Sequence, residues 1–129
     1  MKVGLMQISP SWEKPEESVS KVEMLLEKCK DADLLIFPEM TLTGFSMNAK
    51  DLAEDIDGIS TSYFINLSRE IKTHIIAGII ESDDDKIYNS AVHFNRDGLI
   101  AARYRKIHPF SMGNEEKHYN SSRQTVATV

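Results

Sequence analysis

The chain has 129 residues, of which 41% are hydrophobic and 27% charged, and its formal net charge is −5. This length and composition fit a single globular domain covering residues 1–129. The acidic balance argues against a nucleic-acid-binding protein, which would usually show a basic face. No apolar run reaches the roughly 20 residues of a membrane span, and the N-terminus lacks the apolar core of a secretory signal, so no membrane partner is expected.

The cysteine and histidine content limits which disulfides, metal sites and cofactors the sequence predicts. A single cysteine, Cys29, cannot form an internal disulfide, which makes the cytoplasm the expected compartment. The four histidines show no metal-ligand spacing, and there is no cysteine cluster or glycine-rich phosphate loop. The sequence therefore predicts neither a metal nor a cofactor.

The first half of the chain alternates strands and helices. Residues 3–8 predict a strand, residues 9–14 a loop, and residues 34–37 a short buried strand between Asp33 and Pro38. Pro15 suits a first helical turn. From there to about residue 30, apolar positions three or four apart predict an amphipathic helix: Val19, Val22, Leu26 and Cys29.

The second half predicts an irregular region, a helix, and then mostly β-structure. Gly78 marks a point where another backbone can approach its strand closely. The segment 95–98, Asn-Arg-Asp-Gly, is a good hairpin turn. The expected elements are loop or irregular helix at 43–57, a helix at 61–72 capped by Ser60 or Thr61, strands at 74–80, 87–95 and 99–107, an acidic turn at 82–86, a loop at 109–122 and a β-like run at 124–129. This order predicts an α/β fold with helices packed on a sheet.

Two charged residues stand where α/β proteins often place a site. Glu39 follows a buried strand directly, and the carboxyl ends of strands are where ligands usually bind. Partial desolvation there would make it a better base, although a solvated acid or a helix cap would look the same locally. Alternation along the strand 99–107 places Lys106 on the face opposite Arg105. It could stabilise an oxyanion there, or it could be an edge-strand lysine that only disfavours pairing with another chain.

Cys29 and the acids near residue 115 are weaker candidates. Cys29 shares the apolar stripe of the first helix, where a buried thiol is an inert packing residue. Glu115 and Glu116 are adjacent in a predicted loop, where acids are usually just solvated.

Four segments together resemble the nitrilase superfamily of carbon–nitrogen hydrolases. They are Val3-Gly4-Leu5-Met6-Gln7-Ile8, Phe37-Pro38-Glu39-Met40 with Thr43-Gly44-Phe45, Tyr88-Asn89-Ser90-Ala91, and Tyr104-Arg105-Lys106-Ile107-His108. The resemblance implies the first half of an α-β-β-α sandwich and a Glu-Lys-Cys amidase mechanism. Glu39 would be the general base and Lys106 the oxyanion stabiliser, and Glu115 is similar to the family's second glutamate, with Glu116 as the alternative.

The resemblance also implies a substrate and a missing part. The stretch from Glu39 to Asn48 is most similar to the omega-amidase branch, which implies a small-molecule amide such as the ω-amide of a 2-oxo acid. The family's nucleophilic cysteine lies beyond Lys106, and no cysteine follows Lys106 in this chain. We therefore expect the chain alone to be inactive, and to aggregate or form homo-oligomers such as dimers through an exposed β edge near residues 124–129. The alternatives are a non-catalytic relic or binding module of the same fold, or an unrelated α/β ligand-binding domain.

Overall fold

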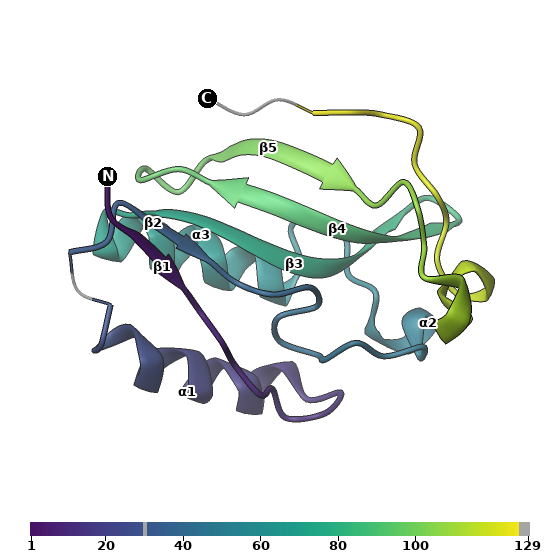
Figure 1. Cartoon of the computed structure of the whole chain (residues 1–129), viewed down its shortest axis with the longest axis horizontal. Helices are drawn as coiled ribbons and strands as arrows, with labels where there is room; N and C mark the ends of the chain where they lie inside the picture. The colour runs from purple at the N-terminus through teal and green to yellow at the C-terminus, as the bar shows by residue number, and fades with distance from the viewer. Residues whose placement is uncertain (30, 127–129) are drawn as a thin grey trace.

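A computed structural model describes residues 1–29 and 31–126. The chain forms one five-stranded sheet in the order β1-β2-β3-β4-β5. β1 (Val3–Leu5), β2 (Leu34–Ile36) and β3 (His74–Asp83) run parallel, and β4 (Lys86–Phe94) and β5 (Ile100–Arg105) continue the sheet antiparallel. Figure 1 shows the two parts side by side, with the antiparallel hairpins at the β5 edge. This mixed sheet confirms the predicted α/β class.

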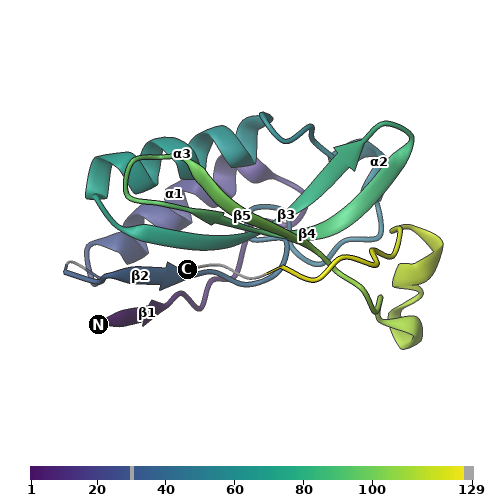
Figure 2. The ribbon, with the colours of Figure 1, turned by 90° about the horizontal axis from the view of Figure 1, so that it is seen from above.

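Two helices lie on the same face of the sheet. They are α1 (Pro15–Leu26) and α3 (Ile59–Ile71), and Figure 2 shows both on one side of the strands. The alternation of β3 explains this packing, because Ile75, Ala77 and Ile79 point to the helices while His74, Ile76 and Gly78 point away. We call these two sides the helix face and the site face. Neither α1 nor α3 covers the site face.

The core of the helix face is centred on Phe64 of α3, which is fully buried. Its ring lies 5.2 Å from the ring of Phe37 and 5.8 Å from that of Phe94, measured between centroids. Val22 of α1 is equally buried in the same cluster. Contacts of this kind join the helix layer to both halves of the sheet, because Phe37 follows β2 and Phe94 ends β4.

The predicted elements are present, and several boundaries differ. The helix expected to reach residue 30 ends at Leu26, because Lys28 and Cys29 donate backbone hydrogen bonds three residues back and tighten the chain into a turn. The helix expected to begin at residue 61 begins at Ile59. Neither Ser60 nor Thr61 caps it. Instead Glu54 accepts the backbone N–H of Ser60 at 2.8 Å and its hydroxyl as well.

The strands also differ from their expected lengths. β1 and β2 are shorter than predicted, and β3 and β4 extend into the acidic stretch, so that only Asp84 and Asp85 form the turn. Asp84 takes a left-handed φ of 53°, which such a tight hairpin requires. The predicted turn at 95–98 is confirmed, with Gly98 at φ 76°. β5 is two residues shorter at its C-terminal end than the predicted strand.

The remaining segments are short. Within the irregular region lies α2 (Ala49–Leu52), and the predicted loop after β5 contains two 3-10 turns, η1 (Ser111–Gly113) and η2 (Glu115–Lys117). The β-like run expected at 124–129 forms no strand at 124–126, and residues 127–129 lie outside the described part of the chain. No helix in the described residues is long and apolar enough to cross a bilayer.

Candidate active site

The chain that carries Glu39 is held against β3 by backbone contacts. After β2, Thr41 donates its backbone N–H to the carbonyl of Gly78 at 2.9 Å. A Cβ on Gly78 would lie 2.6 Å from the Cα of Glu39 and from the backbone nitrogen of Met40, so a side chain there would displace this turn. The close backbone approach predicted at Gly78 is thereby confirmed. Met40 itself has a φ of 46°, an unusual value for a non-glycine residue that redirects the chain directly after Glu39.

The structure brings Glu39, Lys106 and Glu115 together, although Glu39 and Lys106 are 67 positions apart. The ammonium of Lys106 lies 3.3 and 3.4 Å from the two carboxylate oxygens of Glu39 and 3.0 Å from Oε2 of Glu115. Lys106 reaches this point because it follows β5 and points to the site face. Its backbone N–H is fixed by the carbonyl of Asn89 at 2.8 Å.

The two glutamates differ in their surroundings. Glu115 is fully buried and also accepts the backbone N–H of Phe110 at 2.6 Å, whereas the adjacent Glu116 is exposed. Glu115 is therefore the residue of this pair that belongs to the cluster. The side chain of Glu39 is 53% exposed, in line with the partial desolvation expected from the sequence. The chain after Pro38 places Glu39 at the solvent-exposed side of the cluster, whereas Glu115 lies at its buried side.

Burial and hydrogen bonding act in opposite directions on the charged forms. Burial alone would lower the pKa of Lys106, but its hydrogen bonds to Glu115 and Glu39 outweigh burial and raise that pKa. Burial alone would raise the pKa of Glu115, but hydrogen bonds from Asn89, the Phe110 N–H and Lys106 outweigh it and leave the pKa lowered. The arrangement keeps Lys106 protonated and Glu115 ionised near neutral pH.

Asn89 is the residue of this cluster whose role its sequence context does not reveal. Its Nδ2 lies 2.9 Å from Oε2 of Glu39 and 2.8 Å from Oε1 of Glu115. It was noted only as part of a motif before a hairpin. The available signal was its position in β4, where alternation puts a polar amide on the same face as Ala91 and His93. A buried amide needs polar partners, and here both partners are carboxylates.

Cys29 lies away from this cluster. It follows α1 and is partly buried rather than fully buried, because the helix has already ended. Its sulfur lies 3.5 Å from the sulfur of Met6 and packs against the core of the helix face. Cys29 is thus separated by the sheet from the site face, where Asn89 and Lys106 point.

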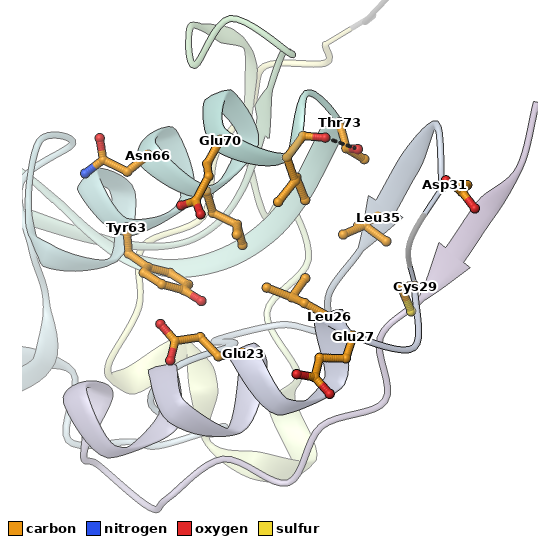
Figure 3. Close-up of a pocket in the computed structure, with 12 residues that line it drawn as sticks. Glu23, Leu26, Glu27, Cys29, Asp31, Leu35, Tyr63, Asn66, Glu70 and Thr73 are labelled. Carbon is orange, nitrogen blue, oxygen red and sulfur yellow. Dashed lines mark hydrogen bonds between the residues drawn. The ribbon is translucent and has the colours of Figure 1, made fainter.

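A separate hollow of about 630 Å³ lies between α1 and α3 and is drawn in Figure 3. Leu26, Leu35 and Cys29 contribute to its lining, and Glu23 and Glu70 lie at its rim. The Tyr63 hydroxyl is buried beside it with no hydrogen-bond partner among the described residues. Neither Glu39 nor Lys106 lines this hollow, so it is not the candidate active site. Groups of three or more metal-ligating side chains are not found in the described part of the chain.

Comparison with known proteins places this geometry in context. A model of the carbon–nitrogen hydrolase family matches residues 2–129. A nitrilase from Pyrococcus abyssi is 33% identical over 117 residues, covering 85% of this chain and 44% of the relative. A 2-oxoglutaramate amidase from Bacillus subtilis is 30% identical over 122 residues, covering 92% of this chain and 47% of the relative. A chloroplastic omega-amidase from Arabidopsis thaliana is 32% identical over 119 residues, covering 85% of this chain and 32% of the relative.

A solved structure gives the same result for the fold. A CN-hydrolase superfamily protein from Xanthomonas campestris superposes with a TM-score of 0.88 at 29% identity, covering 95% of this chain and 46% of that one. The predicted fold, a part of the sandwich of this superfamily, is confirmed. The chain spans less than half the length of each of these relatives.

Proposed function

This chain belongs to the carbon–nitrogen hydrolase family, and on that premise we propose that it supplies the base and the oxyanion-stabilising part of an amidase site. The observation that carries the proposal is the ammonium of Lys106, which lies between the carboxylates of Glu39 and Glu115 on the site face. A base and a cation around one reacting centre are what acyl transfer to a thiol requires. We propose that the thiol belongs to a cysteine outside these 129 residues, because Cys29 lies on the helix face.

The proposed roles follow from the exposure of each group. Glu39 is half exposed and takes the proton of the thiol, and the thiolate then attacks the amide carbonyl carbon. Lys106 stabilises the oxyanion that forms, while Glu115 keeps Lys106 charged and in place. Glu39 returns the proton to the leaving nitrogen as the C–N bond breaks and ammonia departs. Water, deprotonated by Glu39, then hydrolyses the thioester and restores the thiol.

We further propose a small linear amide as substrate, with the ω-amide of a 2-oxo acid as the specific candidate. The likeness to a 2-oxoglutaramate amidase and to an omega-amidase supports this choice. The nitrilase from Pyrococcus abyssi is similar to a comparable degree, so nitriles belong in the same assay. A binding module without catalysis is the competing proposal, and the same assay separates the two.

The test is ammonia release from 2-oxoglutaramate, succinamate and a matching nitrile. It uses a polypeptide that carries residues 1–129 together with the cysteine-bearing half of the family fold. We expect Glu39→Gln to lower turnover by about 10²–10⁴-fold, the usual contribution of a general base. Glu116→Gln is the matched control, because it changes an exposed neighbouring acid and should leave turnover unchanged. Full activity in Glu39→Gln would contradict the proposed base, and a wild type inert toward all three compounds would favour the binding module.

The 129-residue chain by itself should release no ammonia, because none of its described residues places a thiol beside Glu39. Removing the nucleophile of a catalytic unit costs a factor on the order of 10⁶ in turnover. Turnover that survives Cys29→Ser would contradict the thiol mechanism. Turnover that disappears with Cys29→Ser would make Cys29 the nucleophile instead.

A further inference from the structure

Asn89 occupies the one position of β4 that touches all three charged residues. Its carbonyl accepts the backbone N–H of Lys106 at 2.8 Å, while its side-chain nitrogen contacts both Glu39 and Glu115. Asn89 is 5% exposed and pairs with Ile80 of β3, deep within the antiparallel part of the sheet. Its backbone is thus fixed by β3 on one side and, on the other, by the N–H of Lys106 just after the end of β5.

The chemistry of the amide suits this position. A primary amide nitrogen carries two N–H donors, and an ionised carboxylate is an acceptor only. Each donor of Asn89 can therefore be assigned to one glutamate, which also fixes the orientation of the amide. A serine would offer a single donor. A second lysine would add a charge and change the balance of two carboxylates around one ammonium.

The contacts of Glu39 show what this amide achieves. Oε2 of Glu39 accepts from Asn89 at 2.9 Å, whereas the polar contact of Oε1 among the described residues is the longer one, 3.4 Å, to Lys106. A half-exposed glutamate without such an anchor would sample several rotamers, and fixing a side chain of this length costs conformational entropy. The anchor leaves Oε1 as the oxygen that can accept a proton.

We propose that Asn89 is a positioning residue whose single amide clamps Glu39 and Glu115 on either side of Lys106 and so presents Oε1 of Glu39 as the proton acceptor. The proposal rests on the proposed function for the meaning of that orientation. The clamp itself is a property of the folded chain and can be measured without turnover. Failure of the clamp and failure of the proposed function are therefore distinguishable.

The first experiment measures the clamp in the 129-residue chain by NMR. In the wild type, the Asn89 side-chain amide hydrogens should exchange more slowly than those of exposed Asn114. Asn89→Leu keeps a similar volume but removes the donors, so Glu39 should lose its single χ1 rotamer and the pKa of Glu115 should rise toward its ordinary value. Asn89→Asp replaces the donors with a third carboxylate and should do the same to a greater extent.

Ser90→Ala is the matched control for these variants. It removes a hydrogen bond of 2.6 Å to Glu81 from the next residue of the same strand, on the opposite face. It should leave both the Glu39 rotamer and the Glu115 titration unchanged. An Asn89 amide that exchanges like that of Asn114, or Asn89 variants that match Ser90→Ala in both readouts, would overturn the proposal. The wild-type exchange measurement decides the matter even where a variant fails to fold.

The second experiment uses the catalytically complete polypeptide. Asn89→Leu should lower kcat by about 10²-fold, the cost of misplacing a reacting group by about 1 Å, while KM stays within about twofold. A merely structural role would lower the amount of folded protein and leave kcat per folded molecule unchanged, and that result would overturn the positioning role. An inert wild type whose clamp is intact by NMR would instead overturn the proposed function.

Discussion

Two ion clusters lie on opposite faces of the sheet, and β4 and β5 contribute residues at the centre of this region. The lysine cluster, on the site face, consists of Glu39, Asn89, Lys106 and Glu115. The arginine cluster, on the helix face, consists of Glu81, Ser90, Arg103 and Arg105. Two pairs of their members are sequence neighbours: Asn89 precedes Ser90, and Lys106 follows Arg105. Strand alternation sends adjacent side chains to opposite faces.

The clusters differ in how completely the carboxylates are used. Glu81 is fully buried and accepts hydrogen bonds from Ser90 at 2.6 Å, from Arg103 at 2.8 Å, and from two nitrogens of Arg105. Its hydrogen bonds to Arg105 raise the pKa of that guanidinium. In the lysine cluster, Glu39 is half exposed, and among the described residues its Oε1 has one long polar contact, 3.4 Å to Lys106.

This difference separates a carboxylate enclosed by its partners from one that remains accessible to another molecule. Four hydrogen bonds, two to each oxygen, occupy the acceptor positions of the Glu81 carboxylate. Lysine also offers a compact charge with rotatable donors, whereas arginine grips carboxylates with a planar fork.

The largest stability effect is expected in the arginine cluster. Glu81→Ala should lower the free energy of unfolding by about 3–5 kcal/mol, because it leaves two guanidinium groups without their buried partner. Urea denaturation measures this loss. Replacing Glu81 and Arg105 together by leucine should recover most of it, since apolar residues can fill a buried ion-pair site at little cost. A single variant as stable as the wild type would mean that Glu81 does not hold the hairpin.

Glu115→Gln should lower the free energy of unfolding by a smaller amount, about 1.5–3 kcal/mol near neutral pH, which is typical of hydrogen bonds to a charged group. This loss should depend on pH in a defined way. The lowered pKa of Glu115 means that its contribution is present above its unfolded pKa of about 4.3 and is lost as pH falls through the folded value. The raised pKa of Lys106 preserves that residue's contribution until pH rises above about 10.4.

The stability difference between the wild type and Glu115→Gln should therefore be largest between about pH 5 and 10 and shrink in acid. Chemical denaturation at several pH values measures it. Glu116→Gln is again the matched control, because its exposed side chain should give a small difference at every pH. A Glu115→Gln penalty that persists unchanged at pH 2 would show that shape rather than charge sets the cost.

The smallest effect on stability is expected from the histidine pair farther along the site face. Nδ1 of His74 lies 2.9 Å from Nε2 of His93. Burial, followed by repulsion from His74, lowers the pKa of His93. Protonation is thus less favourable in the folded chain, and stability should decline as pH falls below about 6.5. His74 and His93 line a hollow together with Asp33, Arg96 and Met1, which set its charge.

His93→Gln should flatten this part of the stability profile, which thermal unfolding at pH 5 and pH 7.5 would reveal. His108→Gln is the comparison variant, because His108 lies in the loop after β5. Equal pH sensitivity in the wild type and His93→Gln would contradict a role for this pair.

Local sequence alone determined much of the secondary structure. Pro15 and the apolar spacing after it predict α1, and the Asn-Arg-Asp-Gly segment predicts the turn between β4 and β5. These features depend on neighbours within a few positions: Asn95 accepts the backbone N–H of Leu99 through its own side chain. Local patterns did not fix the end of α1 or the cap of α3, because the carboxylate that caps α3 comes from Glu54, outside the helix.

The candidate site divides in the same way. Sequence pointed to Glu39 and Lys106, because their strand-end positions and family resemblance can be read along the chain. The resemblance also named Glu115, with Glu116 as the alternative, and the tertiary structure placed Glu115 in the cluster. Only the tertiary structure gave Asn89 its two carboxylate partners, 50 and 26 positions away. The physical reason is that burial and hydrogen-bond partnership are properties of the space around a residue. Two adjacent glutamates are equivalent in sequence until one of them is buried beside a lysine.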